Sequence, residues 1–199
     1  KYERVISRSG YTADQVAYMI LRNAVITDVS IHHIPGDLTD NYNPREHTLG
    51  LSDKVYGSRS IAAIGVAAHE CGHAIQHARH YVPLTVRSAI IPAANIGSSF
   101  AWPLVLIGLI IPRLNFCMTI GILLFSLVVI LQLVTLPVEF NASRRAIQII
   151  RDSGYLAPDE LKGAKSVLKA AAMTYVAAMV SVSLQLLRLV ILRNSRDDN

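Results

Sequence analysis

Five consecutive residues carry the clearest chemical pattern in the chain, His69-Glu70-Cys71-Gly72-His73. The two histidines are four residues apart, so on a helix they lie on one face, one turn from each other. Two imidazoles placed in this way can bind one zinc ion at about 2.0–2.1 Å. If this segment is helical, the spacing therefore predicts that His69 and His73 are zinc ligands.

Glu70 follows the first histidine and is rotated from it by about 100° around a helix, so it can stand beside the metal without binding it. Zinc polarises a carbonyl and lowers the pKa of a water that it binds toward 7. Glu70 can take the proton from that water and pass it to a leaving amine. This predicts peptide-bond hydrolysis with Glu70 as general base and acid. The alternative is a pair of core histidines beside a solvated glutamate.

A catalytic zinc site needs a third protein ligand and an open fourth position. His77 and His80 follow on the same segment, but a straight helix does not easily bring a third imidazole to the metal from two turns away. The carboxylates outside this segment include Asp37, Asp40, Glu46, Glu139 and Asp152. Glu139 stands out because it ends an uncharged run at a predicted membrane edge, where a lone carboxylate is costly without a partner.

The elements that must position these residues can be predicted coarsely. Ser60–Arg79 is rich in Ala, Ile and Val and predicts a helix whose small residues let other backbone approach closely. Thr12–Ala24 has apolar residues at helical spacing behind a capping threonine. Val29–Ile31 and Thr48–Leu51 predict short strands in a β-hairpin or small sheet, and the stretch 35–46 between them is turn-rich.

Parts of this sheet region are candidates to contact a substrate. The strand Thr48–Leu51 could pair with an extended peptide by strand addition. Tyr42 and His47 are candidates to stabilise a tetrahedral oxyanion. The alternative for both side chains is an ordinary place on the surface of a turn or strand.

The composition indicates a membrane protein or an unusually apolar globule. Hydrophobic residues make up 52% of the 199 residues and charged residues 17%, with a mean hydropathy of +0.37. A soluble domain usually carries about a quarter charged residues. The apolar content excludes a disordered chain. The net charge of +5 is spread along the sequence without interleaved aromatic residues, so a nucleic-acid partner is not expected.

Two uncharged runs are long enough to cross a bilayer, Ser88–Pro112 and Leu114–Val138. A hydrocarbon core of about 30 Å needs about 20 apolar helical residues. We place the membrane parts at Ala93–Ile111 and Phe116–Leu136. A tight turn at Pro112–Asn115 would make them a hairpin, which leaves the two histidines and Glu139 on the same side.

A third uncharged run, Ala170–Leu187, is either a buried helix or a third span with Arg188 reaching toward the interface. Basic residues near the span ends are more numerous on the side of the histidine motif, which predicts a cytosolic active site. They are Arg79, Arg87, Arg144, Arg145, Arg151, Lys162, Lys165 and Lys169, against Arg113, Arg188, Arg193 and Arg196 on the other side.

Three segments in this order resemble the YugP-like family of neutral zinc metallopeptidases of bacterial membranes: TDNYNPR followed by LS, GVAAHECGHAIQHA and LPVEFNASRRA. The resemblance covers nearly the whole chain. The family is more distantly similar to the HtpX-type membrane proteases, and both resemble gluzincins, whose third zinc ligand is a glutamate on a later helix. The resemblance implies an endopeptidase of the bacterial cell membrane with one zinc ion held by His69, His73 and Glu139, and with Glu70 as the catalytic residue.

The chain departs from this pattern in two places. HtpX-type proteases have an aspartate four residues after the ligand glutamate, where it supports a zinc histidine, and here that place holds Ser143. We therefore expect Asn141 or a backbone carbonyl to orient a histidine instead. YugP-like proteins also usually begin with a hydrophobic segment, which we expect upstream of Lys1 in the natural protein.

These observations together predict a mainly α (α+β) integral membrane zincin. It would have a small β-hairpin or sheet before the HExxH helix and two to three transmembrane helices. The expected parts are a zincin-like segment 1–88, a transmembrane hairpin 89–137, amphipathic helices with the third ligand 138–168, and a C-terminal helix and tail 169–199. The expected partners are a peptide or protein substrate, membrane proteins included, and the lipid bilayer.

Two rivals come from other functional classes. One is a non-catalytic membrane scaffold or regulatory binding protein with a structural zinc, which would require a closed set of four ligands. The other is a metal transporter with the histidines as a relay. A transporter would need ionisable residues inside its spans, and the two long runs contain none.

The hairpin predicts that Asn115 and Ser153 lie on opposite sides of the membrane. Single variants Asn115→Cys and Ser153→Cys, probed with a membrane-impermeant thiol reagent in sealed vesicles of one orientation, should react from opposite sides. The unsubstituted chain controls for labelling of Cys71 and Cys117. Reaction of both positions from the same side would contradict the hairpin.

Overall fold

The computed structural model describes residues 2–197, with side chains up to Ser195, and it is mainly helical with one small sheet. The chain forms two compact units. The first contains the chain up to Tyr81 and Val138–Ala172, and the second contains Val82–Pro137 and the chain from Met173 onward. The predicted fold class, mainly α with a small sheet before the histidine motif, is confirmed.

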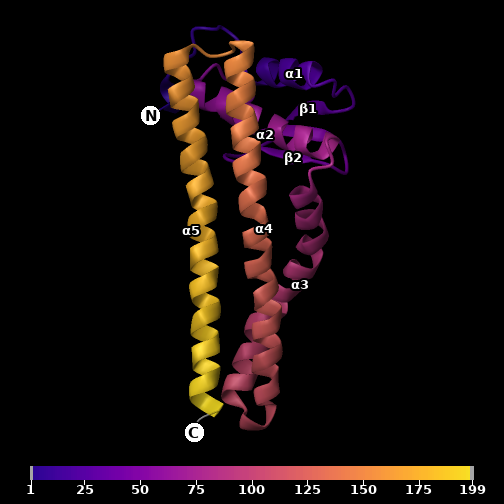
Figure 1. The fold of residues 1–199 in the computed structure, drawn as a ribbon, viewed down its shortest axis with the longest axis vertical. Coiled ribbons are helices and arrows are strands. Elements are labelled where there is room, and N and C mark those ends of the chain that lie inside the picture. Colours follow the sequence, from indigo (N-terminus) through magenta and orange to yellow (C-terminus); the bar gives the residue numbers. More distant parts are fainter. Residues whose placement is uncertain (1, 198–199) are drawn as a thin grey trace. The chain divides into compact units, whose positions relative to one another are not determined.

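Two predicted helices form the core of the first unit, α1 (Ala13–Asn23) and α2 (Ile61–Ala78) (Figure 1). The backbone N–H of Thr12 donates to the Gln15 side chain at 3.0 Å, as expected for the start of α1. Ser60 caps α2 through its side-chain oxygen. The apolar face of α1 packs against α2, which is buried along most of its length and lies at the centre of the unit.

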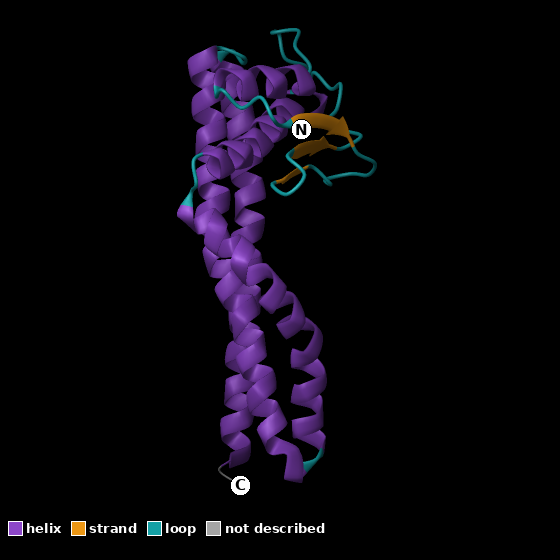
Figure 2. Ribbon diagram, turned by 90° about the vertical axis from the view of Figure 1, so that its right-hand side faces the viewer, coloured by secondary structure: helices purple, strands orange, loops and turns teal. Residues whose placement is uncertain are grey.

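The sheet of the first unit has three strands, β1 (Ser30–His33), β2 (Asn41–Asn43) and β3 (Thr48–Leu51), in the order β1-β3-β2 (Figure 2). β1 runs parallel to β3 and β2 runs antiparallel to it. Two expectations were wrong. The turn-rich stretch 35–46 contains a strand, β2. The strand Thr48–Leu51, which was expected to be open to a substrate strand, lies at the centre of the sheet. Because β3 pairs on both sides, it has no free edge for a substrate strand.

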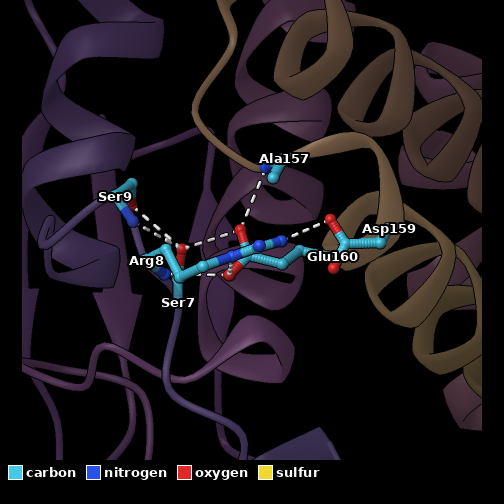
Figure 3. Close-up of polar contacts among 6 residues, drawn as sticks. All are labelled: Ser7, Arg8, Ser9, Ala157, Asp159 and Glu160. Atoms are coloured by element: carbon cyan, nitrogen blue, oxygen red, sulfur yellow. Dashed lines mark hydrogen bonds and ion pairs between the residues drawn. The ribbon is translucent and has the colours of Figure 1, made fainter.

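The N-terminal segment is tied to the start of α5 (Pro158–Asp197), as Figure 3 shows. The Glu160 carboxylate accepts hydrogen bonds from the backbone N–H of Arg8 at 2.8 Å and of Ala157 at 2.9 Å, and from the Ser7 hydroxyl at 3.3 Å. The guanidinium of Arg8 also pairs with Asp159. Glu160 is 6% exposed, so these donors offset the cost of burying its charge.

α2 lies against α4 (Asn115–Ser153) at unusually close range, and Gly72 is the point of contact. A Cβ atom at Gly72 would be 2.7 Å from the backbone oxygen of Ala142 and 3.1 Å from its Cα. No side chain fits there unless one of the helices moves. This confirms the close backbone approach expected from the small residues of α2.

The second unit contains α3 (Val82–Ile110), the 3-10 turn η2 (Pro112–Leu114) and the adjoining parts of α4 and α5. η2 lies where the tight turn was predicted. The buried apolar contacts of the second unit are made by Ala101, Val105, Met118, Ile122, Phe125 and Leu189. Many large apolar side chains are nevertheless exposed, among them Ile96, Phe100, Leu106, Ile110, Leu123, Leu184 and Ile191. Large apolar side chains on the outside, with small and apolar residues at the contacts between helices, are typical of helices that face lipid.

Three helices are long and apolar enough to cross a membrane, α3, α4 and α5. The helices α4 and α5 extend beyond the segments that were expected to be separate helices. The predicted amphipathic helix after Glu139 is the last part of α4, and α5 runs without a break from Pro158 through the third uncharged run. α4 continues through Pro137, which lies two residues before Glu139, and it ends at Ser153, directly before Gly154.

The contact at Gly72 predicts a marked loss of stability on substitution. Gly72→Ala should lower the free energy of unfolding by about 1–3 kcal/mol, because the added methyl group forces α2 away from α4. Gly65→Ala is the matched control, since its Cβ would meet Ala164 at an ordinary 3.4 Å. That variant should be neutral or more stable by up to about 1 kcal/mol through helix propensity. Thermal unfolding of the two purified variants measures the difference, and equal stability would contradict the close contact.

Candidate metal centre

Three predicted site residues converge between α2 and α4. His69 Nε2 lies 3.2 Å from Glu139 Oε2 and 3.2 Å from His73 Nε2, and His73 Nε2 lies 3.6 Å from the same carboxylate oxygen. These atoms are the only group of three or more His, Cys, Asp or Glu donors suited to a metal ion among the described side chains. Glu139 is 2% exposed and His73 is 9% exposed, so the cluster is largely shielded from solvent.

The spacing of the three atoms fits a tetrahedral metal ion. Ligand atoms bound at about 2.1 Å in a tetrahedron are about 3.4 Å apart, and the three separations are 3.2, 3.2 and 3.6 Å. Two imidazoles and one carboxylate are also a donor set that zinc accepts. The three residues present therefore fit a zinc ion in both geometry and chemistry.

The far nitrogen of each imidazole has a hydrogen-bond partner that fixes the ring. His73 Nδ1 lies 3.0 Å from Gln76 Oε1, and His69 Nδ1 lies 3.1 Å from Ser143 Oγ. With Nδ1–H as the donor, each Nε2 keeps its lone pair for a metal. The expectation that Asn141 or a backbone carbonyl orients a histidine was wrong. Ser143 itself contacts the ring of His69, because it lies one turn after Glu139 on α4 and its hydroxyl reaches Nδ1.

Gln76 is the site residue that the sequence reasoning missed. It is fully buried, and its amide nitrogen donates to the backbone oxygen of Val138 at 2.8 Å and to Asn141 Oδ1 at 3.0 Å. Gln76 thus links the ring of His73 to the stretch of α4 that holds Glu139. A signal was present, since Gln76 lies three residues after His73 on the same face of the helix.

The local charges suit a cation. Burial alone would lower the pKa of His73, but its hydrogen bond to Glu139 and the charges of Glu70 and Glu139 outweigh that effect and raise it. Groups that attract a proton to this position attract a metal ion by the same interaction. The carboxylates therefore favour positive charge at the point where the three donor atoms meet.

Glu70 is 8% exposed, and burial is the main reason why its pKa is raised. The carboxylates of Glu139 and Asp40 raise the pKa further, while the two imidazoles of the site lower it. A carboxylate with a raised pKa is a stronger base than an ordinary surface glutamate. This environment is suited to taking up a proton.

The other candidates lie outside the cluster. His77 Nδ1 is 2.9 Å from the hydroxyl of Tyr42, and His47 Nδ1 is 2.6 Å from Asp28. Burial raises the pKa of Tyr42 to about 12, so its hydroxyl keeps its proton. The Cys71 thiol faces α1 and its sulfur lies 3.6 Å from the Ala17 carbonyl oxygen. Asp37, Asp40, Glu46, His80 and Asp152 are also absent from the metal-suited cluster of described residues.

Comparison with known proteins decides the family. The model of a family described as "Putative neutral zinc metallopeptidase" matches residues 1–194. The chain belongs to this family. It is also 46% identical over 200 residues to a Bacillus subtilis (strain 168) protein named "Putative membrane protease YugP", in an alignment that covers 100% of this chain and 88% of that protein. No solved structure gives a significant match. The resemblance drawn from the three sequence motifs is confirmed.

The position of Gln76 predicts weaker metal binding when its hydrogen bonds are removed. Gln76→Met keeps the volume but releases the His73 ring, and it should reduce zinc affinity by about 10–100-fold. Gln148→Met, at an exposed position of α4, is the control and should bind zinc as the unsubstituted protein does. Competition with a chromogenic chelator measures both, and equal affinities would contradict the role of Gln76.

Proposed function

We propose that this protein is a membrane-embedded, zinc-dependent endopeptidase with its metal held by His69, His73 and Glu139. The convergence of three donor atoms at tetrahedral spacing is the observation that carries the proposal. Membership in a zinc metallopeptidase family supports it independently. The i, i+4 spacing on α2 supplies two donors, and α4 brings the third from the side.

The proposed chemistry divides between the metal and Glu70. Bound zinc supplies Lewis-acid polarisation of a carbonyl and activation of water. Glu70 takes the proton of the attacking water and delivers it to the leaving amine. Its burial and raised pKa support this role. The contacts of Gln76 and Ser143 with the two Nδ1 atoms are compatible with the tautomer that leaves each Nε2 atom unprotonated.

We further propose a multi-pass protein of the bacterial cell membrane with the metal centre on the cytosolic face. Three long apolar helices and a relative named as a membrane protease support the location. The excess of Arg and Lys near the span ends on the side of the histidine motif supports the orientation. The proposed substrates are peptides or proteins, membrane proteins included.

A non-catalytic scaffold with a structural zinc is the alternative, and the donor set argues against it. A structural site usually closes the metal with four protein ligands. The described side chains provide three, and the nearby thiol of Cys71 faces α1 instead. The remaining position suits water or substrate, as in a catalytic site.

The ligand assignment predicts the zinc content of two variants. Glu139→Ala should lose most of its zinc, because one of three protein donors is removed from a buried site. His77→Ala should keep close to one zinc per chain, since His77 contacts Tyr42 and not the cluster. Elemental analysis of the two purified proteins compares them, and the reverse pattern would show that the wrong ligand has been chosen.

The assignment of Glu70 predicts a variant that keeps its metal and loses activity. Glu70→Gln removes the proton acceptor but no zinc donor, so zinc content should stay near one per chain. Hydrolysis of casein or a peptide library should fall at least about 100-fold, the usual contribution of general acid–base catalysis. Unchanged hydrolysis at equal zinc content would rule out this role, and absence of any zinc-dependent hydrolysis in the unsubstituted protein would favour the scaffold.

A further inference from the structure

A groove of about 430 Å³ lies between the polar part of α4 and the first turns of α5, within the first unit. Its cationic residues come from both helices, Arg144 and Arg151 from α4 and Lys165 and Lys169 from α5. All four side chains are exposed, and none forms an ion pair with a carboxylate among residues 2–195. Asp152 is the one acidic residue of the lining, so the groove carries an excess of positive charge.

The rest of the lining is largely apolar. Phe140 and Ile147 contribute from α4, and Leu168 and Ala172 contribute from α5. In sequence, Phe140 and Ala172 lie nearest the uncharged runs of their helices, and the other two apolar residues, Ile147 and Leu168, lie between the cations of α4 and of α5. The groove therefore offers apolar side chains both beside and between its cations.

We propose that this groove binds an anionic phospholipid, with its phosphate against the basic residues and an acyl chain against the apolar residues. The inference rests on the proposed membrane location and not on the proposed peptidase activity. Charge complementarity favours an anionic occupant, and an apolar floor beside those charges favours one with a hydrocarbon chain. Basic pockets between membrane helices on the cytoplasmic side bind anionic headgroups in this way. A purely acidic peptide would use the charges and leave the apolar side chains of the groove without a partner.

The groove also touches the candidate metal centre. Ser143 lines it, and the hydroxyl of Ser143 lies 3.1 Å from His69 Nδ1. A lipid in the groove would thus lie one side chain away from a ligand histidine. Anionic lipid bound here is positioned to influence the orientation of that ring.

Native mass spectrometry of the full chain, released from a neutral detergent with added phosphatidylglycerol or phosphatidylcholine, tests the proposal. The unsubstituted protein should retain one phosphatidylglycerol in preference to phosphatidylcholine. Lys165→Gln/Lys169→Gln should bind phosphatidylglycerol roughly 25-fold more weakly, because each lysine near an anionic lipid contributes about a five-fold factor. The control Arg22→Gln/Lys162→Gln removes the same charge outside the groove and should bind as the unsubstituted protein does.

Three results would overturn the proposal. The first is equal retention of the two lipids, and the second is equal weakening by the groove and control variants. The third is unchanged lipid binding by the groove variant together with a raised KM for an acidic protein substrate, which would assign the groove to protein. Zinc content is measured on the same samples and should stay near one per chain. A loss of zinc from the unsubstituted protein would therefore count against the metal centre and not against the lipid site.

Discussion

Burying the carboxylate of Glu139 is the constraint on which the first unit depends. A charged group that is 2% exposed costs several kcal/mol unless partners replace the water that it loses. His69 and His73 are those partners in the structure, at 3.2 and 3.6 Å. Since the imidazoles belong to α2 and the carboxylate to α4, their pairing sets how far the two helices are displaced along each other.

The close approach at Gly72 makes this pairing possible. Side chains one turn apart on α2 reach only a short distance, so α4 must come close for its carboxylate to meet both rings. Gly72 removes the side chain that would hold the helices apart, and the backbone of Ala142 occupies that space. Gln76 then binds the backbone of Val138, one residue before Glu139. The glycine thus permits the short helix spacing, the glutamine adds a second contact that holds the same displacement of the helices, and both serve the position of one carboxylate.

The two units bury different kinds of residue. In the first unit a polar cluster is enclosed by an apolar core, and nearly every polar group of the cluster has a hydrogen-bond partner. In the second unit large apolar side chains such as Phe100 and Leu123 are exposed, while small residues such as Ala101 make helix contacts. Water favours the first arrangement and lipid the second, because apolar side chains lose nothing by facing hydrocarbon. The polar part of α4 begins where this apolar pattern ends.

The sequence alone determined the features that depend on local geometry. The pairing of His69 and His73 follows from the 3.6-residue period of one helix, and the apolar runs follow from composition. Glu139 could be chosen from its place at the end of an uncharged run and from the family resemblance. Local rules did not identify Gln76 and Ser143 as the partners of the imidazoles, because Ser143 lies 74 residues from His69 and the amide of Gln76 is oriented by α4. The order of the strands also depends on distant residues, since β3 is the central strand because β1 pairs with it and not with β2, its neighbour in sequence. Contacts between distant segments depend on how whole elements pack, and only the tertiary structure decides that.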